Sequence, residues 1–336
     1  MNVGIIGCGL IGQKRAQAFG PGHAVVACAD TRLDAAERLA ALHPGSIATA
    51  DAGAVLDRDD VSLVVVATSN DALAALTLAA VERGKHVIVE KPAARRAAEL
   101  GPVIDAARKA GVAVKVGFNH RFHPALRKAH EIWTSGACGP LMFIRARYGH
   151  GGRRGMEREW RGTVARSGGG EMLDQGVHLI DLARWFAGDF VHVEGRVERY
   201  FWDWEVEDNG FALLRTAAGQ VAWLQASCTE WKNTFSFEVF GRDGKLQIDG
   251  LGGSYGVERL TFYKMLPEMG PPETTSWEYP GEDRSWQAEL ADLLTSIETG
   301  RPVLGGLEDA RAALAVVEQL YEQSAMPSLL AGRTTP

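Results

Sequence analysis

The stretch Val3-Gly-Ile-Ile-Gly-Cys-Gly-Leu-Ile-Gly12 (VGIIGCGLIG, residues 3–12) decides the fold of this chain. It starts as a short apolar strand, passes through a turn and enters a helix, and its glycines have the spacing G-x-G-x-x-G. In such a unit the first glycine permits the tight turn, the second lets the backbone approach a pyrophosphate, and the third lets helix and strand pack closely. The free N–H groups at the start of the helix favour an anion. We therefore predict a dinucleotide-binding turn formed by Gly7, Gly9, Leu10, Ile11 and Gly12.

Asp30 ends the next apolar run, Val25–Ala29, and indicates which dinucleotide is bound. A carboxylate at this position accepts hydrogen bonds from the ribose hydroxyls of NAD and repels the 2′-phosphate of NADP. The glycine motif alone is a weak signal for a dinucleotide site. The strand before it, the helix after it and Asp30 together make that interpretation stronger. Arg32 leaves an alternative open, because a nearby arginine could pair with that phosphate, although a solvated residue opening the next helix is the more common role. We predict NAD as the cofactor, with NADP as the alternative.

Apolar runs alternate with helical patterns through the first third of the chain. Leu63–Ala67 is wholly apolar, as expected for a strand inside a parallel sheet, and Val87–Val89 is similar. The helical patterns that precede the later runs stop at Gly84 and Gly111, and glycine favours the position just after a helix. This rhythm predicts an α/β fold over residues 1–121, a Rossmann doubly wound parallel sheet whose ligands bind at the carboxyl ends of the strands.

The rhythm changes after residue 121. Strand follows strand from Val191 to Tyr263, with turns at Ala218-Gly219 and Asp243-Gly244, which is typical of an antiparallel sheet. We predict that residues 122–336 form an α+β domain with a large, mostly antiparallel open sheet, for substrate binding and oligomerisation. Within it we expect helices over Pro124–Trp133, Gly176–Ala187, Trp286–Thr299 and Glu308–Gln323, and a surface loop over Pro267–Asp283.

The composition of the chain limits the classes of protein to which it can belong. The chain has 336 residues, 46% of them hydrophobic and 23% charged, which fits two packed domains. Its net charge of −6 argues against a general nucleic-acid binder, which carries a basic excess. Cys8, Cys28, Cys138 and Cys228 form no C-x-x-C pair, so we expect a reducing cytoplasm. The first residues lack a signal-peptide pattern and no run reaches the ~18 apolar residues of a membrane helix, so we predict no membrane association.

Glu90-Lys91-Pro92 follows the strand Val87–Val89, at the edge where a doubly wound sheet binds its ligands. A lysine there could hydrogen-bond a substrate hydroxyl or carbonyl and stabilise negative charge, and it is our first candidate catalytic residue. A solvent-exposed lysine in a strand-to-helix loop is the alternative. Glu90 and Lys91 are also predicted to contact the cofactor.

A second candidate cluster lies in GGGEMLDQGVHLID, residues 168–181. Asp174 and His178 are four residues apart, so on one helix they share a face. The carboxylate could then orient an imidazole that takes the proton of an alcohol as hydride leaves, or returns it. An aspartate and a histidine at a helix start without a catalytic role are the alternative. Glu171 would complete a metal set, but no second histidine lies at ligand spacing, so we predict no metal.

Together, the glycine motif, Glu90-Lys91-Pro92 and Gly-Gly-Glu-Met-Leu-Asp-Gln-Gly-Val-His (residues 169–178) resemble the Gfo/Idh/MocA family, the oxidoreductases related to glucose–fructose oxidoreductase and inositol dehydrogenase. The resemblance covers most of the chain, and Asn119-His-Arg-Phe122 is similar to the family's segment at the domain junction. It implies a Rossmann domain followed by an α/β domain, and hydride exchange with NAD or NADP. It also implies a homodimer or homotetramer formed through the open sheet, and a catalytic trio of Lys91, Asp174 and His178.

The chain departs from the family after the fourth strand. Members often have Thr-Pro-Asn there with a histidine shortly after, whereas this sequence has Thr68-Ser69-Asn70 and Leu73. The contact near the nicotinamide is therefore expected to differ in detail, although Thr68 and Asn70 stay predicted cofactor contacts. Because the catalytic trio is intact, we expect activity to be retained.

The loop at residues 149–162 is the candidate for substrate choice. It carries four arginines and Trp160, between a strand and the helix with Asp174. If the loop folds over the substrate, an arginine such as Arg153 could bind a carboxylate or phosphate through paired hydrogen bonds. A flexible solvated loop, its charge offset by two glutamates, is the alternative. The residues predicted to contact the substrate are Lys91, Asn119, Arg121, Arg153, Trp160, Asp174 and His178.

These features predict an NAD(P)-dependent oxidoreductase that transfers a hydride between nicotinamide and a hydroxyl or keto carbon of a sugar, inositol or sugar derivative. Two alternatives stay open. One is a lyase or glycosidase that oxidises and later re-reduces the same sugar, and the other is a non-catalytic, NAD-binding regulatory protein. Retention of Lys91, Asp174 and His178 favours the first function, because a sensor would not need all three.

Overall fold

The computed structural model describes residues 1–324. Residues 325–336, which belong to the predicted second domain, lie outside the described residues. The described chain divides into two compact units. Each unit is built around a sheet of its own.

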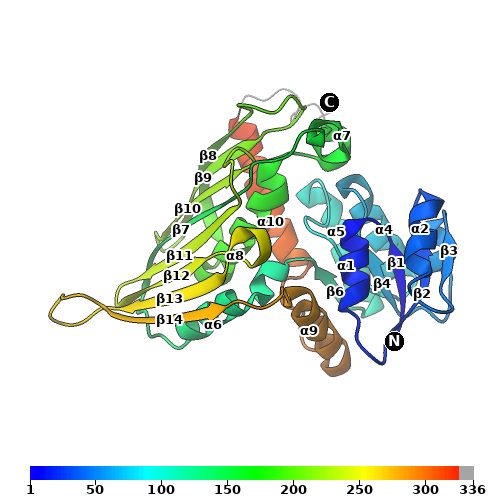
Figure 1. Ribbon diagram of the computed structural model, residues 1–336, viewed down its shortest axis with the longest axis horizontal. Coiled ribbons are helices and arrows are strands. Elements are labelled where there is room, and N and C mark those ends of the chain that lie inside the picture. The colour runs from blue at the N-terminus through cyan, green and yellow to red at the C-terminus, as the bar shows by residue number, and fades with distance from the viewer. Residues whose placement is uncertain (325–336) are drawn as a thin grey trace. The chain divides into compact units, whose positions relative to one another are not determined.

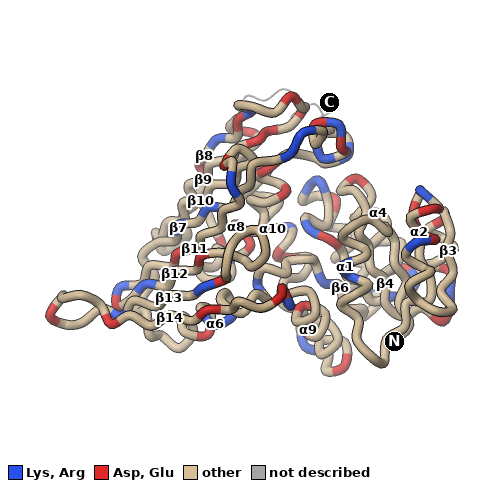
Figure 2. The backbone as a smooth tube through the Cα atoms, viewed as in Figure 1, with Lys and Arg blue, Asp and Glu red and all other residues tan. Residues whose placement is uncertain are grey.

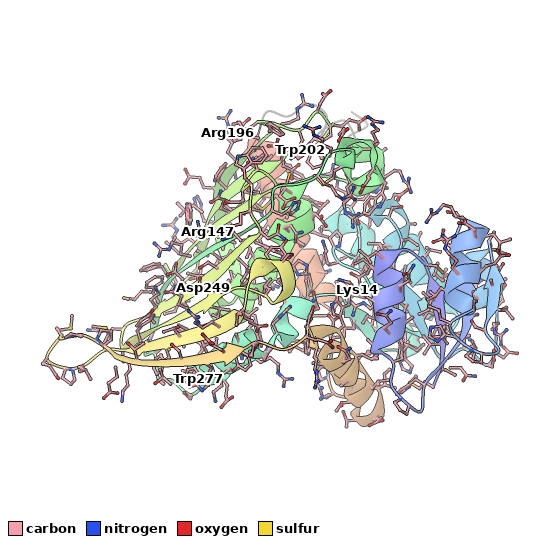
Figure 3. The ribbon with its side chains drawn as sticks, viewed as in Figure 1. Lys14, Arg147, Arg196, Trp202, Asp249 and Trp277 are labelled. Atoms are coloured by element: carbon pink, nitrogen blue, oxygen red, sulfur yellow. The ribbon has the colours of Figure 1, made fainter. Side chains whose placement is uncertain are left out.

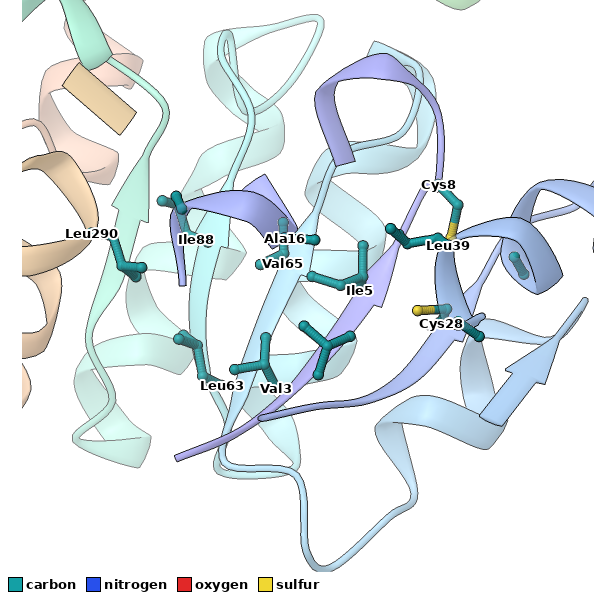
Figure 4. Packing of buried hydrophobic residues seen from close by; sticks show 14 of the residues in the cluster. Val3, Ile5, Cys8, Ala16, Cys28, Leu39, Leu63, Val65, Ile88 and Leu290 are labelled. Atoms are coloured by element: carbon teal, nitrogen blue, oxygen red, sulfur yellow. The ribbon is translucent and has the colours of Figure 1, made fainter. Parts of the chain in front are cut away.

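The first unit contains residues 1–118 and also residues 286–311, which return to it near the end of the chain. The returning segment carries α9 (Ser285–Thr299), and its Leu290 and Leu293 are buried in the core of the first sheet (Figure 4). The sequence pattern predicted one domain boundary, after residue 121, and assigned all later residues to the second domain. An amphipathic helix shows that it has an apolar face, but it does not show which sheet that face covers.

Six parallel strands in the order β3-β2-β1-β4-β5-β6 form the first sheet (Figure 1). The order reverses after β3, so that β4 lies on the other side of β1, and the carboxyl ends of β1 and β4 are neighbours. The prediction of a Rossmann doubly wound sheet is confirmed. The strands are β1 (Asn2–Ile6), β2 (Ala24–Ala29), β3 (Ile47–Thr49), β4 (Leu63–Val66), β5 (His86–Val89) and β6 (Val114–Val116). The helices, besides α9, are α1 (Leu10–Ala18), α2 (Leu33–Ala40), α3 (Ala52–Leu56), α4 (Asn70–Glu82) and α5 (Leu100–Ala110).

Burial of apolar side chains holds this sheet together. All of β4 is buried, as its unbroken Leu-Val-Val-Val sequence predicts. Val3 and Ile5 of β1 pack into the same cluster as Val65 and Ile88 of the neighbouring strands (Figure 4). Each such side chain stabilises the fold by about 1.5–3 kcal/mol relative to exposure to water.

Two short elements of the first unit, β3 and α3, were not predicted. The strand has three residues at the edge of the sheet and pairs with β2. The helix that follows has Asp51 as its N-cap, and the carboxylate of Asp51 accepts the N–H of Gly53 at 2.8 Å. Segments this short contain too few periods of the hydrophobic pattern to be recognised in the sequence.

The second unit contains an eight-stranded sheet in the order β14-β13-β12-β11-β7-β10-β9-β8. Neighbouring strands are antiparallel except for β7 and β10, which are parallel, so the predicted α+β fold is confirmed. The strands are β7 (Leu141–Gly149), β8 (Phe190–Glu198), β9 (Asn209–Thr216), β10 (Val221–Ser227), β11 (Thr234–Gly241), β12 (Gly244–Asp249), β13 (Glu258–Lys264) and β14 (Glu273–Tyr279). The helices are α6 (Pro124–Thr134), α7 (Val164–Ser167), α8 (Val177–Ala187) and α10 (Leu307–Gln323), of which the residues from Ala312 belong to this unit.

The loop predicted over Pro267–Asp283 contains β14, so that prediction was wrong for seven residues. The strand pairs antiparallel with β13, from Glu273 opposite Lys264 to Tyr279 opposite Glu258. Prolines precede the strand and follow it but do not interrupt it, so the pairing with β13 overrides the loop-like composition of the segment.

One face of the second sheet is covered by helices and the other is exposed. On β7 the buried Ile144 and Ala146 alternate with the exposed Phe143, Arg145 and Arg147. The helix α8 contacts β7 and β10, and α6 contacts β12, β13 and β14. Figure 2 shows basic and acidic residues together along these strands. The exposed face therefore mixes aromatic and charged side chains, as a polar surface or an interface between subunits does.

The longest helix of residues 1–324 is α10, with 17 residues. Among the helices of this part of the chain, none combines the length and the apolar character that a bilayer-crossing segment needs.

Candidate active site

The predicted dinucleotide-binding turn has the geometry that its glycines suggested. Gly7 has a positive φ of 94°, and a Cβ there would collide with the backbone carbonyl of Ala67. A Cβ at Gly12 would collide with the carbonyl oxygen of Gly7, so this glycine allows helix and turn to touch. A Cβ at Gly9 would meet nothing within 4 Å, which leaves room for a ligand next to the backbone.

The helix α1 begins directly after this turn. Its N-cap is Gly9, which has no side chain that could accept a hydrogen bond from the first amides of the helix. Leu10, the first helical residue, is 69% exposed. These amides and the helix dipole suit the pyrophosphate of a dinucleotide.

Asp30 lies beside the turn, at the end of β2. Its Oδ2 accepts the N–H of Cys8 at 2.8 Å, and its Oδ1 accepts the N–H of Arg32 at 2.9 Å. A carboxylate has about four acceptor positions, so these bonds fix its orientation and leave capacity for ribose hydroxyls. The side chain of Arg32 is exposed. The geometry therefore favours an acceptor for NAD at this position.

Thr68 and Asn70 follow the carboxyl end of β4, next to the turn on β1. Thr68 Oγ1 donates to the carbonyl of Ser69 at 3.2 Å, and Asn70 is the first residue of α4. Leu73, at the position where the family often has a histidine, is fully buried and packs as an apolar core residue.

Glu90, a predicted cofactor contact, pairs with Arg15 in the structure. Its Oε1 accepts a hydrogen bond from Arg15 Nε at 2.6 Å, and both side chains are buried. The same guanidinium donates to Glu289 on α9 and lies 4.3 Å from the ring centroid of Trp286. Burial raises the pKa of Glu289, while the charge of Arg15 counteracts the shift. Glu90 thus belongs to a buried ion-pair network.

Lys91 follows Glu90 directly and is half-buried at the carboxyl end of β5, as predicted. The Lys91–Pro92 peptide bond is cis. The network that holds Glu90 includes Arg15 on the helix after the glycine motif and Glu289 near the end of the chain. Neither residue was predicted, because no local motif marks a partner that lies 75 or 274 positions away.

In the second unit, Asp174 and His178 lie on one helical stretch, but the helix is not regular between them. Residues 172–176 form a π-helical turn, and α8 continues from Val177. A π turn widens the helix by about one residue, so the stretch between Asp174 and His178 departs from regular α-helical geometry, and such bulges are frequent at functional sites. Asp174 is partly exposed and its N–H donates to the carbonyl of Gly170 at 2.8 Å.

His178 is 3% exposed and lies among other rings. Its imidazole stacks on that of His120, with centroids 3.8 Å apart, and meets Tyr148 edge-on at 6.4 Å. Asn119 Oδ1 lies 3.2 Å from His120 Nδ1, which orients this second imidazole. His120 and Tyr148 were not among the predicted site residues, although His120 is part of the quoted Asn119–Phe122 segment.

Two tyrosines border the same cluster. Burial raises the pKa of Tyr255 to about 12 and that of Tyr148 well above its usual range, and the negative charges of Glu171 and Asp174 add to both shifts. Both hydroxyls therefore stay protonated at neutral pH and can donate hydrogen bonds.

Two predicted substrate contacts, Asn119 and Arg121, have partners within the second unit. Arg121 forms a two-point ion pair with Asp181, at 2.8 and 2.6 Å, and both side chains are buried. Asn119 Nδ2 donates to Ser285 Oγ at 2.9 Å. These contacts favour a structural role for Arg121 and an orienting role for Asn119.

The loop at residues 149–162 is held next to the helix that carries Asp174. Near its start, His150 Nε2 lies 3.6 Å from Glu171 Oε1. Near its end, Arg161 Nε lies 3.6 Å from Asp174 Oδ2. The loop is thus anchored at both ends, and its end lies beside Asp174, a predicted catalytic residue.

Arg161 is the arginine of this loop that lies next to Asp174. Arg153 was predicted to contact the substrate. Arg153 pairs with Glu159, and its side chain is 66% exposed. The guanidinium of Arg161 also lies 4.5 Å from the ring of the predicted Trp160. Arg161 thus contacts both Asp174 and Trp160.

Tryptophans from the connection between β8 and β9 support this loop. A Cβ at Gly152 would collide with the indole of Trp202, the residue labelled in Figure 3. A Cβ at Gly162 would lie 3.2 Å from the Cβ of Trp204. The two indoles are 6.2 Å apart. The loop glycines are thus needed for close packing on an aromatic base.

Within residues 1–324, no group of three or more His, Cys, Asp or Glu side chains is arranged to hold a metal ion.

Comparison with known proteins identifies both parts of the chain. Residues 1–118 match the profile of the oxidoreductase family with an NAD-binding Rossmann fold, and residues 126–247 match the GFO/IDH/MocA C-terminal domain. The dTDP-3,4-didehydro-2,6-dideoxy-alpha-D-glucose 3-reductase of Actinomadura kijaniata is 30% identical over 252 residues, which cover 74% of each chain. The levoglucosan dehydrogenase of Pseudarthrobacter phenanthrenivorans is 29% identical over 235 residues, which cover 65% of this chain and 59% of that protein.

A solved structure has the same fold over nearly the whole chain. Levoglucosan dehydrogenase in complex with NADH and levoglucosan superposes with a TM-score of 0.85 at 24% identity, covering 96% of this chain and 98% of that one. The glycine turn, the two sheets and the two matched profiles agree, and the chain therefore belongs to the Gfo/Idh/MocA oxidoreductase family, with an NAD-binding Rossmann fold at its N-terminus and the family's C-terminal domain after it.

Proposed function

We propose that this protein transfers a hydride between nicotinamide and a hydroxyl or keto carbon of a sugar, inositol or sugar derivative. One observation carries the proposal: a single bulged helix presents Asp174 and His178, and His178 is oriented by its stack on His120. A histidine in this setting can exchange the proton of an alcohol during hydride transfer.

The residues of the turn fit a dinucleotide. The space at Gly9, the open amides of α1 and the anchored carboxylate of Asp30 would hold the pyrophosphate and the adenosine ribose. NAD is the proposed cofactor, because a 2′-phosphate would meet the charge of Asp30. When bound, the nicotinamide supplies the hydride acceptor or donor.

Lys91, Asp174 and His178 have separate proposed roles. His178 takes the proton of the substrate hydroxyl in oxidation and returns it in reduction. Lys91 hydrogen-bonds the reacting oxygen and favours its alkoxide character. Asp174 stabilises the positive charge that His178 gains when it takes the proton.

A hydroxyl-rich ring is the proposed substrate class. The relatives above are named for an anhydrosugar and for a nucleotide-linked sugar, and Trp160 and Arg161 next to Asp174 would offer an apolar face and a hydrogen-bond donor. Indole faces suit the C–H face of a sugar, and a guanidinium suits hydroxyls or phosphates.

Absorbance of the reduced nicotinamide tests the proposal. Levoglucosan, myo-inositol, methyl glucosides and sugar nucleotides are each offered with NAD and with NADP. We expect net NADH production with at least one substrate. Cleavage of a sugar bond without net NADH would indicate the lyase alternative, and binding of NADH without turnover of any substrate would indicate a regulatory protein.

Variants then assign the roles. We expect Lys91→Ala and His178→Ala to lower kcat by about 100-fold or more, with the dissociation constant of NADH nearly unchanged. Lys109→Ala and His192→Ala, at exposed positions, are the matched controls. Full turnover by His178→Ala would remove the proposed proton transfer.

The exposed sheet face supports a homodimer or homotetramer, which we propose as the working assembly. It carries Phe143 and Trp223, which are 38% and 41% exposed on neighbouring strands. Light scattering after gel filtration measures the assembly. We expect Trp223→Glu to shift it to smaller species, and an unchanged mass would place the interface elsewhere.

A further inference from the structure

Glu207 lies just before β9 and is fully buried, although its side chain is a carboxylate. Its Oε2 accepts the N–H of Gly170 at 2.8 Å, and its Oε1 accepts the N–H of Met172 at 3.0 Å. Its backbone carbonyl accepts the N–H of Glu171, between them, at 3.2 Å. One residue thus binds three consecutive amides.

A fourth partner of Glu207 comes from α10, far along the chain. The buried hydroxyl of Tyr321 donates to Glu207 Oε1 at 2.7 Å. A Cβ at Gly169 would collide with this hydroxyl, and a Cβ at Gly170 would collide with the carbonyl oxygen of Glu207. The glycines at these positions therefore let the chain approach Glu207 and Tyr321 closely.

The three amides open the helical stretch that presents Asp174 and His178. The first N–H groups of a helix have no partner inside the helix, and the oxygens of Glu207 supply acceptors for them. The carbonyl of Gly170 also accepts the N–H of Asp174 at 2.8 Å. Hydrogen bonds therefore run without interruption from Tyr321 through Glu207 and Gly170 to Asp174.

We propose that Glu207 and Tyr321 are positioning residues, which fix the start of this helix and with it the working orientation of Asp174 and His178. The inference rests on the catalytic roles proposed above for these two residues. Glu207 and Tyr321 act through backbone amides and do not touch the reacting atoms. Such support matters because a displacement of about 1 Å in a catalytic group can cost about 100-fold in rate.

Two mild substitutions test the inference. Tyr321→Phe removes one hydroxyl and keeps the ring, and Glu207→Gln keeps the shape of the side chain and one acceptor oxygen. Tyr200→Phe is the matched control, because Tyr200 lies in the connection leading to Glu207 and is 66% exposed. With levoglucosan or myo-inositol and NAD, we expect both test variants to lower kcat about 10- to 100-fold. The KM values and the dissociation constant of NADH should stay within about twofold, and Tyr200→Phe should match the parent.

Hydrogen exchange of the protein without substrate gives an independent readout. We expect the amides of residues 170–178 to exchange faster in both test variants, with the first unit unchanged. Parent-like kcat or parent-like exchange in Tyr321→Phe overturns the inference, as does a parallel loss of NADH affinity, which would mean a general folding defect. If Glu207→Gln does not fold, Tyr321→Phe alone decides. Full turnover by His178→Ala would instead remove the proposed catalytic role, and the exchange data would still report whether Glu207 and Tyr321 hold the helix start.

Discussion

The imidazole of His178 lies face to face with that of His120, with ring centroids 3.8 Å apart and planes inclined by 23°. Asn119 holds His120 in place through its Oδ1. The stack therefore orients the ring of His178, the proposed proton carrier.

Removing the stacked partner should reduce turnover. We expect His120→Ala to lower kcat about tenfold, because His178 loses the ring that fixes its plane. His120→Phe keeps a flat ring at the same position and should retain most of the activity. Steady-state kinetics measures both, and a Phe variant as impaired as the Ala variant would show that stacking is not the relevant property.

Arg15 compensates two buried carboxylates in the core of the first unit, so its loss should be costly. We expect Arg15→Met to lower the free energy of unfolding by about 3–5 kcal/mol, because Glu90 and Glu289 would stay buried without their cation. Denaturant titration measures the change. Adding Glu289→Gln to this variant should recover part of the loss, because one uncompensated charge is removed.

The exposed pair of Arg38 and Asp34, each 61% exposed, gives the control for this prediction. Arg38→Met should change the free energy of unfolding by less than about 1 kcal/mol, because water screens the pair. Equal effects of Arg15→Met and Arg38→Met would contradict the importance of the buried network.

The carboxylate of Asp30 should set the choice of cofactor. Asp30→Asn keeps an oxygen for the N–H of Cys8 and removes the charge that repels a 2′-phosphate. We expect the ratio of kcat/KM for NADP to that for NAD to rise about tenfold or more, which corresponds to about 1.4 kcal/mol. Asp34→Asn, at an exposed site on α2, is the control. An unchanged ratio in Asp30→Asn would mean that other residues select the cofactor.

Glu207 should make the stability of the protein depend on pH in an unusual direction. Burial raises the pKa of Glu207 from 4.5 to about 7, although the hydrogen bonds from Tyr321, Gly170 and Met172 oppose the shift. Between these values the folded chain keeps a proton that the unfolded chain has lost. The contribution of Glu207 to the free energy of unfolding therefore falls as pH rises through this window, by about 3 kcal/mol in total.

Comparison with Glu207→Gln isolates this contribution, because the other carboxylates titrate in both proteins. The nearby thiol of Cys228 stays neutral throughout, since burial raises its pKa. The free energy of unfolding of both proteins is measured between pH 4.5 and pH 7. As pH rises, we expect the parent to lose stability relative to Glu207→Gln. A difference that is independent of pH would contradict the raised pKa.

Local patterns determined most of the architecture. The run Leu63–Val66, the glycine motif and the stops at Gly84 and Gly111 fixed the elements of the first sheet, because period, turn geometry and helix ends are local properties. The same applies to the candidates Lys91, Asp174 and His178, which stand in recognisable short motifs. Short or edge strands such as β3 and β14 were not predicted, because they form by pairing with a neighbouring strand rather than from a local sequence pattern.

The sequence by itself determined which residue types stand at the ends of strands and at the start of the helix that carries Asp174 and His178. Only the tertiary structure decided their partners: Arg15 for Glu90, His120 for His178, Glu207 for the glycine run, and the first sheet for α9. The physical reason is that burial and charge compensation act between segments that are distant along the chain. No short motif in a single sequence shows which distant residues will pair. In the folded chain the pairing is specific, because burying a charge without its partner costs free energy.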